Sequence, residues 1–334
     1  MTKKKAGFNF WERNRLSNGY LLRKRITKYG VSILRAILLF GLCFLILQPV
    51  LNKISVSFMG ENDLYDPVVI SIPKHFTIAN YKIAADPLIM DYSNSLVHSI
   101  IISFTIALLQ IAMCTLVGYG FARFQFPLKK LWFALVILVI IIPPQTISSS
   151  LYLHFNFFDI FGIIKATTGA PLNLRNSPVP YYLISAGCMG LKNGLYIYMV
   201  RQYFRNIPVD LEEAAYIDGC GTLKTFIRIM LPQAKPIITS CFLFAFVWQW
   251  TDGFYSKLFF QSVSLVSTSL ARIVNSLSVY IGRAQGTVQA QLTVARSNQI
   301  LSTGTLMIVF PVIFLYLFAQ RAFVESIAST GIKM

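Results

Sequence analysis

The chain alternates between long apolar stretches and shorter polar segments. Six of the apolar stretches, 20 to 28 residues long, could each cross the hydrocarbon core of a bilayer as a helix. They cover residues 31–58, 95–121, 131–153, 179–203, 237–260 and 300–319. The pattern predicts an all-α polytopic membrane protein with six transmembrane helices.

Two of the predicted spans are interrupted. Pro143 and Pro144 lie in the outer half of the third span, and each lacks the N–H that a continuous helix needs, so they should kink or end it. The fourth span is interrupted by residues 190–194, Gly-Leu-Lys-Asn-Gly. We therefore expect irregular backbone inside the membrane at both places.

Composition agrees with a membrane protein. The 334 residues are 55% hydrophobic and 13% charged, with a mean hydropathy of +0.60, whereas a soluble domain carries about 25% charged residues. The net charge of +17 lies beside the predicted spans, so it indicates orientation in the membrane rather than nucleic-acid binding. Five cysteines without a Cys-x-x-Cys spacing predict neither a disulfide framework nor a metal site.

The basic residues indicate the orientation. Nineteen of the 30 Lys and Arg lie in the segments predicted to be inside and seven in the outer ones, which places both termini in the cytoplasm. The N-terminal segment is expected to remain as a basic tail, not as a cleaved signal peptide. The predicted organisation is a basic cytoplasmic tail at 1–30, a first helix and outer loop at 31–94, a core at 95–325, and a cytoplasmic tail at 326–334.

Residues 206–236 are the longest run in the C-terminal half that is both charged and patterned. Asp210 and Glu213 have the spacing of a capping box, which predicts a helix start. Gly219 and Gly221 should break that helix. The segment is predicted to lie on the cytoplasmic side.

A second helix should follow the glycines. Thr222 is placed to cap it. Its apolar positions, spaced three and four residues apart, predict one apolar face made of Leu223, Phe226, Ile227 and Met230. Pro232 should end it.

The same segment carries motifs of a known family. Glu213-Ala214-Ala215, Asp218-Gly219 and Leu231-Pro232 resemble the EAA loop of ABC importer permeases. Ile217 before Asp218-Gly219 is similar to the carbohydrate-importer subgroup. The resemblance covers roughly residues 75–325 and includes, in order, Asn80-Tyr81, Asn94-Ser95-Leu96, Gly118-Tyr119-Gly120, Arg123, Pro143-Pro144-Gln145, Arg201-Gln202, Trp250-Thr251-Asp252 and Gln320-Arg321. It is to the MalG-like type of sugar permease, with departures at Cys220 and Thr251.

The resemblance implies the type I ABC importer permease fold and a set of partners in a bacterial cell membrane. These are a second permease subunit that is expected to form a heterodimer with this chain, a pair of ATPase subunits that bind ATP and Mg²⁺, and an external solute-binding protein. This chain would itself hold no cofactor and hydrolyse no ATP, and it has no Gly-x-x-x-x-Gly-Lys-Ser/Thr phosphate loop. The residues implied to couple to the ATPase are Glu213, Ala214, Ala215, Asp218, Gly219, Leu231 and Pro232.

Candidate sugar contacts follow from residue type. Sugars are held by aromatic faces together with a few polar groups, and an ionisable residue within a span suggests function. The candidates are Trp248, Gln249, Trp250, Asp252 and Tyr255 in the fifth span, Gln145 in the third, and Lys192 and Asn193 in the fourth. Packing and interface anchoring are the alternative roles for the aromatic residues.

Two other functional classes remain open at this point. An ion-coupled secondary transporter would predict internal repeats and coupling charges within the spans, and a non-transporting assembly subunit would need no ATPase contact. The chain shows no obvious repeat, and residues 206–236 favour the ABC importer.

Overall fold

The computed structural model describes residues 10–331 and places them in two compact units, Met1–Phe76 and Thr77–Met334. Each unit is described by itself. Residues 1–9 of the predicted basic tail and residues 332–334 of the predicted C-terminal tail lie outside the described part.

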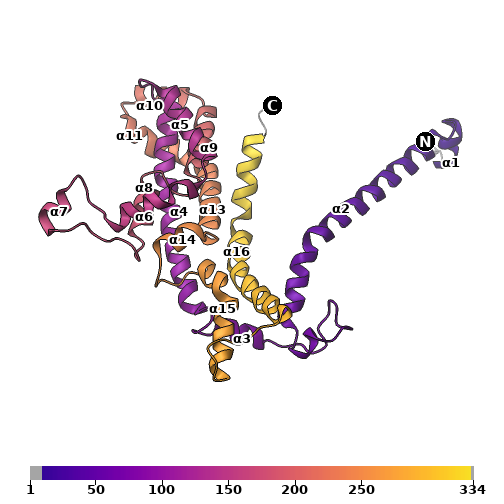
Figure 1. Ribbon diagram of the computed structural model, residues 1–334. Coiled ribbons are helices and arrows are strands. Elements are labelled where there is room, and N and C mark those ends of the chain that lie inside the picture. Colours follow the sequence, from indigo (N-terminus) through magenta and orange to yellow (C-terminus); the bar gives the residue numbers. More distant parts are fainter. Residues whose placement is uncertain (1–9, 332–334) are drawn as a thin grey trace. The chain divides into compact units, whose positions relative to one another are not determined.

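The described part of the chain is almost entirely helical (Figure 1). Its β pairing consists of two isolated bridges, Met59 with Phe76 and Phe158 with Leu172. The helices are α1 (Phe10–Leu16), α2 (Tyr20–Phe58), η1 (Asn62–Leu64), α3 (Ala79–Ala85), α4 (Tyr92–Arg123), α5 (Lys129–Ile141), η2 (Pro144–Ile147), α6 (Ser148–Asn156), α7 (Ile163–Thr168), α8 (Val179–Ala186), α9 (Asn193–Asn206), α10 (Asp210–Ile217), α11 (Thr222–Thr225), η3 (Phe226–Met230), α12 (Leu231–Gln233), α13 (Lys235–Trp250), α14 (Phe254–Phe259), α15 (Val266–Ala284) and α16 (Val294–Gly331). This confirms the predicted all-α class.

The first unit contains the long helix α2. It begins at Tyr20, eleven residues before the predicted span, immediately after Gly19 in the left-handed conformation. The added residues are largely Leu, Arg and Lys, which are good helix formers, so the polar flank continues the apolar helix. The apolar part has hydrophobic side chains all around its circumference, as a lipid-facing helix does.

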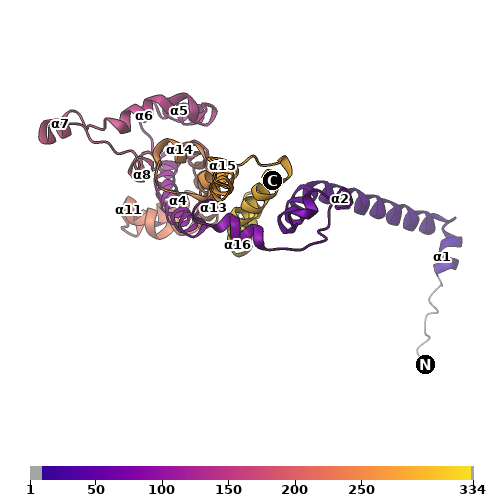
Figure 2. The ribbon, with the colours of Figure 1, turned by 60° about the horizontal axis from the view of Figure 1, so that its bottom comes forward.

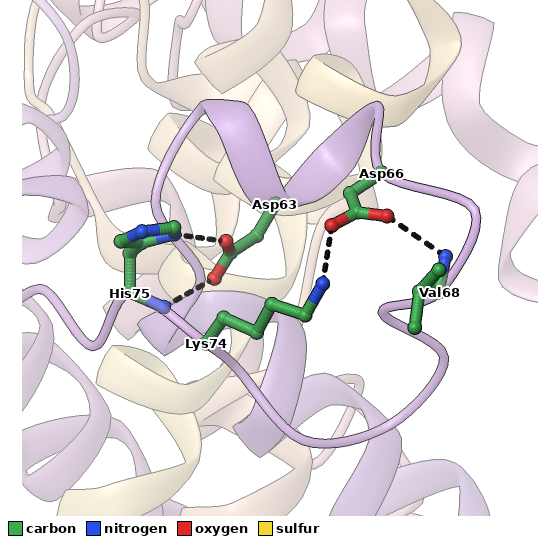
Figure 3. Close-up of polar contacts among 5 residues, drawn as sticks. All are labelled: Asp63, Asp66, Val68, Lys74 and His75. Atoms are coloured by element: carbon green, nitrogen blue, oxygen red, sulfur yellow. Dashed lines mark hydrogen bonds and ion pairs between the residues drawn. The ribbon is translucent and has the colours of Figure 1, made fainter.

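The loop after α2 is held by two carboxylates (Figure 3). Asp63 is buried and accepts hydrogen bonds from the backbone N–H of His75 at 2.8 Å and pairs with its Nδ1 at 2.6 Å. Asp66 pairs with Lys74 Nζ at 2.6 Å and accepts from the backbone N–H of Val68 at 2.9 Å. These side-chain contacts add to the Met59–Phe76 bridge and to the bond from the N–H of Gly60 to the carbonyl of His75, at 2.9 Å, which join the two ends of the loop.

The second unit is a helical bundle built around α4. This helix packs along α9 and α13, while α16 packs against α13 and α15 (Figure 1). A Cβ added at Gly118 of α4 would lie only 2.8 Å from Cγ1 of Val200 on α9. Small residues at such crossings let membrane helices approach closely, so Gly118 sets the α4–α9 distance.

The predicted third and fourth spans are broken helices. Helix α5 ends at Ile141. The helical segment that follows, Pro144–Asn156, is bent by 98° from α5 at the two prolines, which confirms the predicted kink. The fourth span consists of α8 and α9, with residues 187–192 between them.

Six continuous spans are not established by the structure. Within residues 10–331, three helices are long and apolar enough to cross a membrane, or up to five if each of two bent helix pairs counts as one span. The second bent pair joins α11–α12 to α13 at 75°, so the membrane-facing helix of the fifth span starts directly from residues 206–236. The interruption predicted at residues 190–194 of the fourth span is observed at residues 187–192, whereas the break at residues 251–253 in the fifth span was not predicted.

A long excursion between α6 and α8 carries the short helix α7, which extends away from the bundle in both views (Figures 1 and 2). The Phe158–Leu172 bridge closes its base. Asp159 Oδ1 accepts the backbone N–H of Ile164 at 2.9 Å and so fixes the start of α7. This excursion corresponds to the loop predicted at residues 154–178.

The Asp63 contact predicts a pH-dependent loop. The hydrogen bond from the backbone N–H of His75 holds the pKa of Asp63 below its ordinary value. A lowered folded-state pKa means that the contact contributes fully above the ordinary Asp pKa and is lost as the pH falls through the lower, folded-state value. The rate of amide hydrogen exchange of residues 60–76, corrected for the intrinsic rate at each pH, should rise only as the pH falls through the folded-state pKa of Asp63.

The variant Asp63→Asn tests the cause. It should exchange faster at neutral pH and lose the acidic transition, whereas Glu61→Gln, a change at a neighbouring exposed residue, should behave like the unmodified protein. Equal exchange in Asp63→Asn and the unmodified chain would show that the carboxylate does not hold the loop.

Candidate functional site

The EAA residues lie on α10, and this helix has two different faces. Ala215 is buried against the bundle, while Glu213, Ala214 and Asp218 are exposed. Glu212 is buried on the same side as Ala215, three residues earlier. Since residues three apart share a helix face, one face of α10 packs against the rest of the chain and the other face is exposed.

The predicted caps in this region are wrong in detail. Helix α10 starts at Asp210, so Asp210 is inside the helix, and the N-cap is Val209 with no side-chain cap. The acidic residues of the first turn still suit the positive helix end. For α11 the N-cap is Gly221 in an extended conformation, and Thr222 is its first helical residue.

Gly219 ends α10 as predicted. Its φ is +75°, a left-handed conformation that favours glycine. The N–H of Gly219 donates to the carbonyl of Tyr216 at 3.0 Å and that of Cys220 to Ala215 at 2.9 Å. This pair of bonds is the Schellman motif, which satisfies the carbonyls at the helix end. A Cβ at position 219 would meet nothing within 4 Å, so the requirement for glycine is conformational rather than steric.

The second half of the loop does not form one apolar face. Phe226 and Met230 are buried, whereas Leu223 and Ile227 are 69% and 51% exposed. These side chains sort into two pairs, each four residues apart, one buried and the other exposed. The π-helical segment η3 changes the helical period here, which the assumed 3.6-residue period did not include.

Leu231 and Pro232 lie in the short helix α12. Pro232 is exposed and stands in its first turn, where a missing N–H is tolerated, so it does not end the helix as predicted. Leu231 is half-buried and packs on the core.

A buried ion pair fastens the loop to the bundle. Glu212 Oε2 lies 3.1 Å from Arg123 Nε, and both side chains are less than one-tenth exposed. The hydroxyl of Tyr119 donates to Glu212 Oε1 at 2.9 Å. Arg123 also donates to the carbonyl of Ile207 at 2.8 Å. Through these contacts the cytoplasmic end of α4 holds both α10 and the chain that leads into it.

The sequence reasoning missed Glu212 and treated Arg123 as a topology signal. A signal was present, because Tyr119 and Arg123 are four residues apart and therefore on one face of the helix at the cytoplasmic end of the predicted second span. A buried arginine needs a carboxylate partner, and residues 206–236 supply the nearest acidic group on that side of the predicted topology.

The structure brings some of the sugar-contact candidates together. A cavity of about 250 Å³ lies between the proline kink and the α8–α9 break, and its wall includes Lys192, Asn193 and Tyr255. Lys192 Nζ lies 5.0 Å from the ring centroid of Trp248, which is 47% exposed. Gln145 is exposed just beyond the prolines but does not line this cavity.

The other candidates in the fifth span are buried. Trp250 stacks on Phe246, and its indole N–H donates to the carbonyl of Ile308 at 3.2 Å. Gln249 is also buried. These contacts give Trp250 a packing role between α13 and α16, while a contact with sugar stays a prediction for both residues.

Asp252 is buried at the start of α14. Its oxygens accept the backbone N–H groups of Phe254 and Ser256, at 3.1 and 2.9 Å, and the Tyr181 hydroxyl at 3.2 Å. These contacts satisfy a carboxylate that would otherwise be costly within a span. Its predicted place on the sugar path stays untested.

The chain matches a known protein family. Residues 114–329 match the family of binding-protein-dependent transport system inner membrane components. The chain belongs to this family. The matched region includes the α10–α12 loop, the α8–α9 break and the residues of the Arg123–Glu212 pair. The protein is therefore a multi-pass membrane protein.

Individual relatives extend the likeness. A probable ABC transporter permease of Pyrococcus horikoshii is 28% identical over 57% of this chain and 63% of its own length. The melibiose/raffinose/stachyose import permease MelC of Bacillus subtilis is 28% identical over 72% of this chain and 76% of its own. A crystal structure of a bacterial ABC transporter that imports the acidic polysaccharide alginate shares the fold, with a TM-score of 0.62 and 17% identity over 88% of this chain and 97% of that one.

The ion pair leads to a stability prediction. Glu212→Gln keeps the side-chain size but leaves Arg123 buried without its counter-charge, which costs about 3–5 kcal/mol for a buried pair. We expect a clearly lower Tm in detergent and loss of order in residues 206–222. The exposed neighbour provides the control, since Glu213→Gln should change the free energy of unfolding by no more than about 0.5 kcal/mol.

Replacing both partners gives a second check. The variant Glu212→Leu with Arg123→Met removes both charges and should recover part of the loss, because no uncompensated charge remains. Equal Tm values for Glu212→Gln and Glu213→Gln would contradict a structural role for the pair.

Proposed function

We propose that this chain is one permease subunit of an ATP-driven importer that moves a sugar or oligosaccharide into the cytoplasm. In this proposal the chain crosses the membrane six times, with both termini in the cytoplasm. Its partners are a second permease subunit, an external solute-binding protein and a pair of ATPase subunits. The ATPase pair binds ATP and Mg²⁺, and this chain takes no part in the hydrolysis.

The observation that carries the proposal is the two-sided α10. Its inner face is fixed to α4 by the Arg123–Glu212 pair, while its outer face displays two carboxylates, Glu213 and Asp218, that make no ion pair among the described residues. Exposed apolar side chains lie beside them, with Ile217 86% and Leu223 69% exposed. Such a mixture of apolar and charged groups is typical of a protein-binding surface.

This arrangement suits mechanical coupling. A segment that is held by a buried ion pair at one face can pass a displacement from a partner at its other face to α4. Helices α11 and α12 connect directly to α13 through a bend of 75°, which gives a second connection to the membrane helices. Closure of an ATPase pair would therefore move two spans of the bundle together, and the bundle would alternate between inward-open and outward-open forms.

A sugar as the cargo is supported by the relatives and by the residues of the cavity. The name of MelC specifies melibiose, raffinose and stachyose as its cargo. The cavity beside the proline kink combines an aromatic ring, Tyr255, with an amide, Asn193, and an ammonium group, Lys192. This is the combination of apolar wall and few polar groups that sugar sites use.

Substitutions of Gly219 test coupling, because they change the backbone preference at the end of α10 without bringing a new Cβ into contact with other atoms. Gly219→Val places a β-branched residue at a left-handed position and costs about 1–3 kcal/mol locally, whereas asparagine tolerates that conformation. Both add a Cβ into open space. In proteoliposomes with the complete importer, Gly219→Val should lose most of the binding-protein-stimulated ATP hydrolysis, and Gly219→Asn should retain it.

A crosslink from position 217 to the ATPase tests the docking itself. Ile217→Cys should form the crosslink in the assembled importer, and Thr239→Cys, within α13, should not. Normal transport after deletion of residues 210–222 would overturn the coupling proposal.

A further inference from the structure

The break between α8 and α9 is the most unusual backbone in the second unit. Two residues with side chains, Cys188 and Lys192, have positive φ values of 58° and 61°. Such conformations cost energy in residues other than glycine and persist where the surrounding structure enforces them, often at ligand sites. The break is held from two sides, since Gln110 Nε2 of α4 donates to the carbonyl of Leu191 at 3.2 Å and Gly194 packs tightly on α5.

Lys192 is the single cation on the cavity wall, and the wall contains no acidic residue. None of the ion pairs in the described residues includes Lys192, and the carboxylate of Asp252 is occupied by its own hydrogen bonds. The ammonium group instead rests over the face of Trp248, at 5.0 Å from the centroid. A cation–π contact at an exposed ring is weak compared with a paired carboxylate, so the cation is available to a ligand.

The start of α9 adds to the positive potential. Lys192 is the N-cap of this 14-residue helix, and its first turn contains no acidic residue. Asn193 and Gly194 of that turn line the cavity. In broken membrane helices, such a positive end next to a cavity suits the anionic group of a substrate.

We propose that this cavity is a subsite for the carboxylate of an acidic saccharide, with Lys192 as the residue that pairs with the carboxylate. Tyr255 provides the aromatic ring on the cavity wall for the sugar, while Trp248 lies beside the ammonium group and does not line the cavity. The volume of about 250 Å³ suits one sugar ring and its carboxylate rather than a whole chain. A neutral sugar would cover the ammonium group without compensating its charge, and so would bind less well.

This inference rests on the proposed function and names the cargo class. It is tested with the assembled importer in nanodiscs of phosphatidylcholine, a neutral lipid that supplies no competing anionic headgroup. The probes are trisaccharides of galacturonate, glucuronate and mannuronate, each compared with its own methyl ester, which keeps the size and removes the charge. Equilibrium binding is measured for each.

At least one acid should bind more tightly than its ester. Lys192→Met should weaken binding of that acid about tenfold or more, the loss expected for a charge-assisted hydrogen bond, and leave the ester unchanged. Lys192→Arg should stay within about threefold, because the charge is kept. Lys257→Met is the matched control, since Lys257 lies on α14 with Tyr255 but does not line the cavity.

Three results would overturn the inference. These are esters that bind as well as acids, an unchanged affinity in Lys192→Met, or binding of raffinose and maltotriose by an importer that binds none of the acids. In each of these cases ATP-driven uptake of a neutral sugar would leave the proposed function standing. An importer that binds and moves neither class of saccharide would overturn both.

Discussion

The contact between Arg123 and Glu212 is the constraint on which the proposed mechanism depends. Two opposite charges are removed from water at the point where α4, around which the second unit is built, meets the exposed loop. Neither charge can be left alone there without a large cost, so the loop and the helix must move as one body. A flexible connection at this point would let a partner displace the loop while the membrane helices stayed in place.

The broken helices have a different physical basis. Backbone N–H and carbonyl groups inside a bilayer need partners, so irregular backbone occurs where protein or a cavity surrounds it. The α8–α9 break follows this rule, with Gln110 bonded to one of its carbonyls and a cavity at its other side. The rigid ion pair lies at the α10–α12 loop, and the irregular backbone lies at the cavity. The segment proposed to bind the ATPase is therefore separate from the segment suited to a ligand.

Local patterns predicted much of this structure. The apolar runs located the long helices, the two prolines located the 98° bend, and Gly219 was expected to end a helix. The motifs around Glu213 indicated the family that the comparison confirms. Each of these features depends on residues close together in sequence.

The features that were missed depend on distant residues or on an irregular helical period. The pair of Glu212 and Arg123 joins residues 89 positions apart, so the sequence around Arg123 indicates that a partner is needed but not which carboxylate supplies it. The separation of Leu223 from Phe226 follows from a π-helical turn, which a regular period cannot represent. For Trp250 and Asp252 the contact with sugar stays a prediction; within the protein they bind a carbonyl, two backbone amides and the Tyr181 hydroxyl.

The exposed apolar side chains of the loop also bear on how such a complex is made in the cell. Ile217 and Leu223 are mostly exposed on a segment that the buried ion pair already holds within this chain, so no partner is needed to hold the segment in place. A subunit without its partners would then keep an exposed apolar patch in water, and chaperones and proteases recognise such apolar surface. The same residues that suit docking would therefore mark unassembled subunits for removal and help to keep the amounts of the subunits matched.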